Sequence, residues 1–118
     1  MRDHKKLRAF ELADDLAVAI YGATRTFPHE ERFGLTAQLR RAAVSIASNI
    51  VEGSARFSQS EYIHFLNIAY GSAREVEYQV SLAARLGFLE EASRHELSDL
   101  CVETSKVLNA LLRSLRAP

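Results

Sequence analysis

The 118-residue sequence has little of several residue types: one cysteine, two prolines, five glycines and no tryptophan. One cysteine cannot form an internal disulfide, and an unpaired thiol is typical of a reducing compartment, so we expect a cytoplasmic protein. The scarcity of proline and glycine excludes most all-β folds, which need many turns. Basic and acidic residues number fifteen each, so the excess positive charge of strongly basic nucleic-acid-binding proteins is missing.

Long apolar runs are missing as well. In the basic N-terminal segment, Glu11, Asp14 and Asp15 interrupt the apolar residues, so we expect neither a secretory segment nor a membrane span. Apolar residues nevertheless make up 47% of the chain, which is enough for a proper core. We therefore expect a single domain over residues 1–118.

Apolar residues recur with the helical period in four segments, which are separated by short breaks. We expect these helices at residues 5–26, 35–53, 59–86 and 92–116. Pro28 ends the first, because the residue before a proline avoids the α region. Ser58 and Glu61 form a capping box that opens the third, and Gly87 follows its end. Breaks this short join antiparallel neighbours, so the sequence predicts an all-α, up-down-up-down four-helix bundle.

The second of these segments is apolar around more than half of its circumference. Ile46 and Ile50 mark one face, and Val44 and Val51 extend the apolar surface well beyond it. A surface helix of a small bundle needs an apolar stripe only somewhat wider than ~100°. The narrow polar stripe that remains contains Gln38, Arg41, Ser45, Ser48, Asn49 and Glu52. We predict that this helix packs on its own bundle and also against another subunit.

The third segment carries tyrosines and arginines in an arc that the wheel places opposite its apolar stripe. The residues in this arc are Ile63, Asn67, Tyr70, Arg74, Tyr78, Ser81 and Arg85. Tyrosine and arginine stack on bases and bind phosphates, but they are also favoured at protein–protein interfaces. The neutral net charge favours the interface interpretation. Gly71 costs about 1 kcal/mol in mid-helix, which the close approach of another helix would explain.

Two sets of candidate site residues follow. The predicted oligomer interface comprises Gln38, Arg41, Val44, Ser45, Ser48, Asn49, Glu52, Tyr70 and Tyr78. The predicted nucleic-acid contacts are Arg40, Arg41, Arg56 and Arg74. Arg56, just past the end of the second helix, is expected to be the freest of these arginines to meet an external anion.

Signals for catalysis are weak. A di-iron bundle needs two Glu-x-x-His motifs and two further carboxylates, whereas this chain has one such motif, Glu61 to His64. Cys101 lies in the leucine stripe of the fourth segment, where a small buried hydrophobe is expected. We therefore expect no catalytic residues, no metal and no cofactor. The alternative is a metal-dependent or small-ligand-binding enzyme that uses the bundle interior.

A long motif allows a comparison with a known family. The chain contains Phe27-Pro28-x-x-Glu31-x-x-Gly34-Leu35-x-x-Gln38-x-Arg40-Arg41-Ala42-Ala43-x-Ser45-Ile46-x-x-Asn49-Ile50-x-Glu52-Gly53, followed by Phe65-Leu66-x-Ile68-Ala69-x-Gly71-Ser72-x-x-Glu75 and Leu86-Gly87-Phe88-Leu89. This pattern resembles the four-helix bundle family named for 23S ribosomal RNA intervening sequences. The resemblance implies a small bacterial cytosolic protein that assembles into a ring-like homopentamer and has no enzymatic activity.

The same resemblance implies partners. A related protein, the accessory variability determinant of diversity-generating retroelements, binds nucleic acid and a reverse transcriptase through a positively charged barrel. The expected partners are therefore other copies of this chain, RNA or DNA, and another protein. We expect a non-catalytic, homo-oligomeric scaffold or adaptor with weak nucleic-acid binding.

Overall fold

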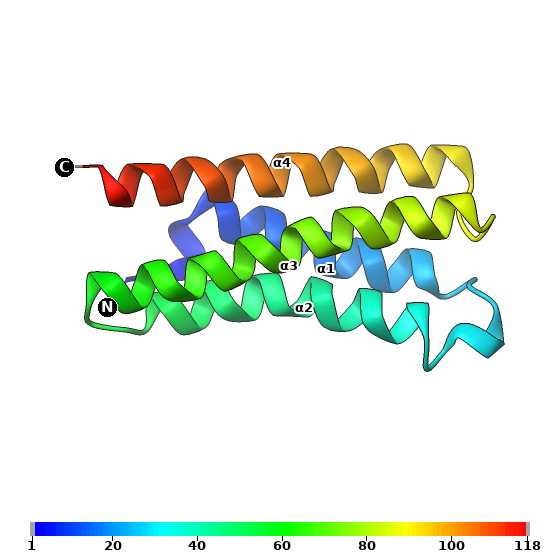
Figure 1. Ribbon diagram of the computed structural model, residues 1–118, viewed down its shortest axis with the longest axis horizontal. Coiled ribbons are helices and arrows are strands. Elements are labelled where there is room, and N and C mark those ends of the chain that lie inside the picture. Colours follow the sequence, from blue (N-terminus) through cyan, green and yellow to red (C-terminus); the bar gives the residue numbers. More distant parts are fainter. Residues whose placement is uncertain (1, 118) are drawn as a thin grey trace.

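The computed structural model describes residues 2–117, and within them the prediction of an all-α chain with four helices and no strand is confirmed (Figure 1). The helices are α1 (Arg8–Thr24), α2 (Leu35–Ser54), α3 (Gln59–Arg85) and α4 (Glu91–Arg116). Consecutive helices run in opposite directions, and the bundle measures 46 × 23 × 19 Å (Figure 1). None of these helices combines the length and the apolar composition that a membrane span needs.

The start of α1 differs from the sequence expectation. A separate 3-10 turn at His4–Lys6 precedes it, because the Asp3 carboxylate accepts a hydrogen bond from the Lys5 amide at 3.1 Å. The helix therefore begins at Arg8 rather than at residue 5. A second 3-10 turn, His29–Glu31, follows Pro28 and leads into α2. The other three helices begin and end within one residue of the expected positions.

Local sequence signals set both ends of α3. The Ser58 hydroxyl accepts a hydrogen bond from the Glu61 amide at 3.1 Å, which is the N-cap contact of a capping box. The same hydroxyl donates to the Glu61 carboxylate at 3.2 Å. At the other end Gly87 has a φ of +81°. The Phe88 amide then donates to the Ala83 carbonyl at 2.9 Å, which completes a Schellman motif.

Each helix contributes one apolar stripe to a continuous core. The largest fully buried side chains are Tyr62, Leu16, Ile20, Leu39, Ile46, Ile50, Leu66 and Leu108. The C-terminal half of α2 approaches α3 closely at Gly53, where a Cβ atom would lie 2.8 Å from the Phe65 Cβ. Gly71, in contrast, has no atom within 4 Å of the place that its Cβ would occupy. The close helix approach expected at Gly71 is therefore found within the chain at Gly53 instead.

Candidate assembly surface

The centre of the outward face of α2 carries no charged side chain. At about 100° per residue, positions 37, 44, 48, 51 and 55 fall in one narrow arc that faces away from the bundle. Val44 is 41% exposed and Val51 is 37% exposed, and Ser48 lies between them, also exposed. We call Val44, Ser48 and Val51 the α2 ridge. A helix on the surface of a monomeric bundle normally places charged residues in this arc.

Two residues of the predicted interface are used within the chain. The Ser45 hydroxyl hydrogen-bonds the Ser72 hydroxyl of α3 at 2.9 Å. The Asn49 amide donates to the Ser45 carbonyl at 2.8 Å and to the Ser45 hydroxyl at 3.0 Å. Both α2 residues are half-buried. Ser45 therefore links α2 to α3, and Asn49 supports Ser45 from within α2.

A groove between α2 and α3 brings other predicted residues together. Its lining residues are Gln38, Arg41, Ala42, Ser45, Ser72 and Glu75. Arg41 and Glu75 are both exposed and border this groove from different helices. Among residues 2–117, neither of them forms an ion pair. The two charges therefore remain available to an external partner.

The four predicted nucleic-acid contacts do not form one cluster. The Arg40 guanidinium donates to the Thr24 hydroxyl of α1 at 2.9 Å and stacks on the Tyr21 ring at 4.6 Å. Arg74 lies 3.8 Å from the Glu77 carboxylate and lines a groove toward α4 rather than toward α2. Arg41 is thus the member of the set that faces the groove between α2 and α3.

The expectation that Arg56 is the freest arginine is wrong. Its guanidinium donates to the Glu52 carboxylate at 2.8 Å and lies over the Phe65 ring at 4.9 Å. The cause is helical spacing, because the chain continues in the α conformation through Ala55 and sets Glu52 and Arg56 four residues apart on one side. Because this ion pair occupies the Glu52 carboxylate, Glu52 does not offer an unpaired charge to the predicted interface.

The outer face of α3 is divided between a covered and an open part. Tyr70 is half-buried, packs on the core and lines a groove with Ser105 and Lys106 of α4. It does not lie opposite the core, because α4 covers this side of α3. Tyr78 is 58% exposed, and Gly71 is exposed as well.

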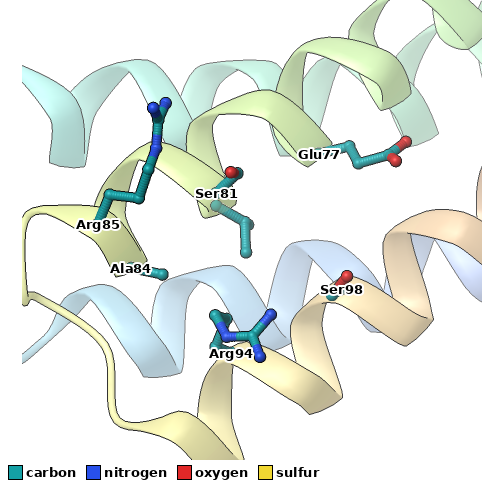
Figure 2. Close-up of a pocket in the computed structure, with 7 residues that line it drawn as sticks. Glu77, Ser81, Ala84, Arg85, Arg94 and Ser98 are labelled. Atoms are coloured by element: carbon teal, nitrogen blue, oxygen red, sulfur yellow. The ribbon is translucent and has the colours of Figure 1, made fainter.

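A second groove between α3 and α4 is lined by Glu77, Val80, Ser81, Ala84, Arg85, Arg94 and Ser98. Figure 2 shows Arg85 extending away from α4, while Glu77 points along α3 in another direction. Arg94 is already paired with the Glu91 carboxylate. A ligand site needs polar groups that converge on one point, and these groups diverge.

The bundle interior provides no activated nucleophile at its cysteine. Cys101 is fully buried, and this burial, reinforced by the Glu77 carboxylate, raises the pKa of its thiol to about 12. The thiol is therefore protonated at neutral pH, whereas nucleophilic and metal-binding cysteines act as thiolates. Glu61 is engaged at the helix cap, and His64 is exposed. Residues 2–117 contain no group of three or more His, Cys, Asp or Glu that could hold a metal ion.

Comparison with known proteins finds a matching family pattern and matching solved structures. The pattern of the family described as 23S rRNA-intervening sequence protein matches residues 5–110. The chain also has the fold of a solved protein of unknown function from the S23 ribosomal protein family of Bacteroides thetaiotaomicron. That similarity has a TM-score of 0.82 at 25% identity and covers 89% of this chain and 95% of the other. Among curated proteins, none matches the sequence.

Proposed function

Because the chain belongs to the 23S rRNA-intervening sequence protein family, we propose that it is a non-catalytic scaffold built from several copies of itself. The observation that carries this proposal is the α2 ridge. Two exposed valines flank a serine in the arc where a monomer would place charges. Exposed apolar side chains that are contiguous on one face favour protein–protein contact.

The form of the assembly is part of the proposal. We take it to be the ring-like homopentamer implied by the sequence resemblance, acting in the cytoplasm, where an unpaired cysteine stays reduced. The bundle is suited to such a role, because its fold depends on the inward stripes and leaves the outer face of α2 free for a neighbour. Nothing in residues 2–117 favours the enzyme alternative, since the one cysteine is protonated and the Glu61–His64 motif does not point into the core.

Weak nucleic-acid binding is the second part of the proposal. Arg41 supports it, because this exposed guanidinium has no ion-pair partner among the described residues and would be repeated once per copy in a ring. Fluorescence anisotropy with a structured RNA and a duplex DNA should show weak binding that falls steeply with salt. Arg41→Ala should remove most of it. An intact oligomer that binds neither probe at low salt would contradict this part alone.

The experiment that tests self-assembly is a measurement of mass by light scattering. The wild-type protein should have a mass several times the 13.2 kDa of one chain. Ser48→Glu should reduce it to 13.2 kDa with unchanged helicity, because it places a charge in the α2 ridge. The matched control is Ser114→Glu, the same change at an exposed position of α4, which should keep the wild-type mass. A Ser48→Glu protein that also keeps this mass would contradict assembly through α2.

A further inference from the structure

We propose that the α2 ridge of one copy packs on the outer face of α3 of the next copy, around Gly71. This inference rests on the proposed self-assembly and names the surface that receives the ridge. We define the α3 face as Ile68, Gly71 and Glu75, three exposed residues of α3, of which Glu75 borders the groove with α2.

Gly71 has no explanation within the chain. It lies in the middle of a 27-residue helix, where glycine costs about 1 kcal/mol relative to alanine. A side chain at this position would meet no atom within 4 Å, so packing inside the bundle does not require glycine. Ile68, one turn earlier, is 40% exposed. An exposed glycine beside an exposed isoleucine is explained when a second backbone packs against this face.

The register between α2 and α3 places the two surfaces at the same height. The hydrogen bond between Ser45 and Ser72 and the contact of Gly53 with Phe65 fix this register. Counting along the antiparallel helices from Ser45 and Ser72 sets Gly71 level with position 46, which lies between Val44 and Ser48. Ile68 is level with position 49, between Ser48 and Val51. Gly71 and Ile68 thus stand level with the two gaps in the α2 ridge.

A ring whose axis runs along the bundle keeps these heights from one copy to the next. Val44 and Ser48 of one copy then meet Gly71 of its neighbour, and Val51 meets Ile68. The same counting sets Glu75 level with position 42, next to Arg41. Both charges border the groove between α2 and α3, so they lie on the same rim of the contact. Neither has an ion-pair partner among residues 2–117. The two opposite charges would attract each other across this exposed rim, where the Arg41 guanidinium still faces the open groove and can reach a phosphate.

The arrangement of the helices explains why such a contact closes into a ring. α2 and α3 are neighbouring helices that pack along much of their length, so their outer faces point roughly at right angles to each other. Because the contact joins two different faces, each copy can bind a further copy in the same way. The angle between the faces rotates each copy relative to the previous one, so the series of copies closes into a ring after a few copies. Contact of the α2 ridge with itself would instead stop at a two-fold dimer.

A mixing experiment tests this pairing. Ser48→Glu blocks the ridge and leaves the α3 face intact, whereas Gly71→Leu blocks the α3 face and leaves the ridge intact. Each variant alone should sediment at the 13.2 kDa of one chain. Mixed at the highest soluble concentration, they should form a complex of two chains, because one ridge and one α3 face remain competent. Gly71→Leu should also unfold at a higher temperature than the Ser48→Glu monomer, since leucine is the better helix former and has room there.

The outcomes separate this inference from the proposed function. If Ser48→Glu dissociates the wild-type assembly but Gly71→Leu keeps its mass, assembly through α2 stands and the α3 face is overturned as its partner. If both variants are monomers and their mixture remains at the mass of one chain, the pairing is also overturned. If Ser48→Glu itself keeps the wild-type mass, the proposed assembly through α2 is contradicted, and the pairing that rests on it is contradicted too.

Discussion

The outer faces of α2 and α4 are opposite in character although the two helices contribute similar stripes to the core. The exposed outward residues of α4 include Glu96, Asp99, Glu103, Lys106 and Arg113. The same arc of α2 contains Val44, Ser48 and Val51. Since the fold depends on the inward stripes, it does not require either outer face to be charged or uncharged. The absence of charge at the centre of the outward face of α2 is therefore a separate property, which the proposed contact with another copy would explain.

The largest expected effect comes from the same substitution on both faces. Val44 of α2 and Val102 of α4 are 41% and 36% exposed, so they form a matched pair. Val44→Lys should dissociate the assembly, because a charge would be buried without a partner in the contact. Val102→Lys should leave the mass unchanged by sedimentation. Equal masses for the two variants would remove the distinction between the faces.

The inner faces should respond alike. Ile46 of α2 and Leu108 of α4 are both fully buried in the core. Replacing either by alanine should lower the free energy of unfolding by about 2–5 kcal/mol, through lost burial and the cavity left behind. Urea unfolding is best measured in the Ser48→Glu background, since the stability of an oligomer depends on its concentration. A large cost at one site and none at the other would mean that one of these helices lies outside the cooperative core.

A smaller effect concerns pH and the inner face of α4. Because burial raises the pKa of Cys101 to about 12, the folded state keeps a proton that the unfolded state loses at lower pH. The contribution of this thiol to the free energy of unfolding should be constant below the ordinary thiol pKa. Above that pKa it should fall by at most about 1.4 kcal/mol per pH unit, until the pH reaches the pKa of the thiol in the folded state. Cys101→Ala should reduce this slope between pH 9 and 10, measured by urea unfolding. An unchanged slope would show that the thiol is not buried as described.

The smallest effect is expected at the N-terminal end of α4, where Glu91 and Arg94 form an ion pair. The hydrogen bond from Arg94 lowers the pKa of the Glu91 carboxylate, so the pair is present at neutral pH and is lost as the pH falls through that lowered value. Glu91 is exposed and Arg94 is half-buried at the protein surface, and surface pairs of this kind contribute little to stability. Glu91→Gln should leave the thermal midpoint and the mass nearly unchanged. A clear loss of mass would place α4 in the assembly contact.

The sequence was sufficient for the parts of the fold that depend on local chemistry. The helical period located four helices, Ser58 and Gly87 marked the ends of α3, and Cys101 was correctly expected to be buried. The sequence indicated a close helix approach at Gly71 only, and a mid-helix glycine does not say whether the partner lies inside the chain. The structure resolves this ambiguity by measuring the space at each glycine.

The candidate site was harder to predict for a related reason. A helical wheel gives the direction of each side chain but not which neighbouring helix covers it, so Tyr70 was placed opposite the core although α4 lies over it. The ion pair between Arg56 and Glu52 was missed because the end of α2 was expected at residue 53, one residue too early. Ile68 and Glu75 were in the family motif. Only the register of α2 on α3 shows that Ile68 is level with the α2 ridge and that Glu75 is level with position 42, next to Arg41.

The most direct test of the central claim, that another copy covers the α2 ridge, is the rate of thiol labelling. The native Cys101 is buried and protonated, so an introduced cysteine supplies the reactive thiol. In concentrated protein, the Ser48→Cys thiol should react much more slowly than the Ser114→Cys thiol, and adding Val44→Lys should abolish the difference. Equal rates for the two thiols in the otherwise wild-type chain would show that the α2 ridge is open to water and would contradict the account.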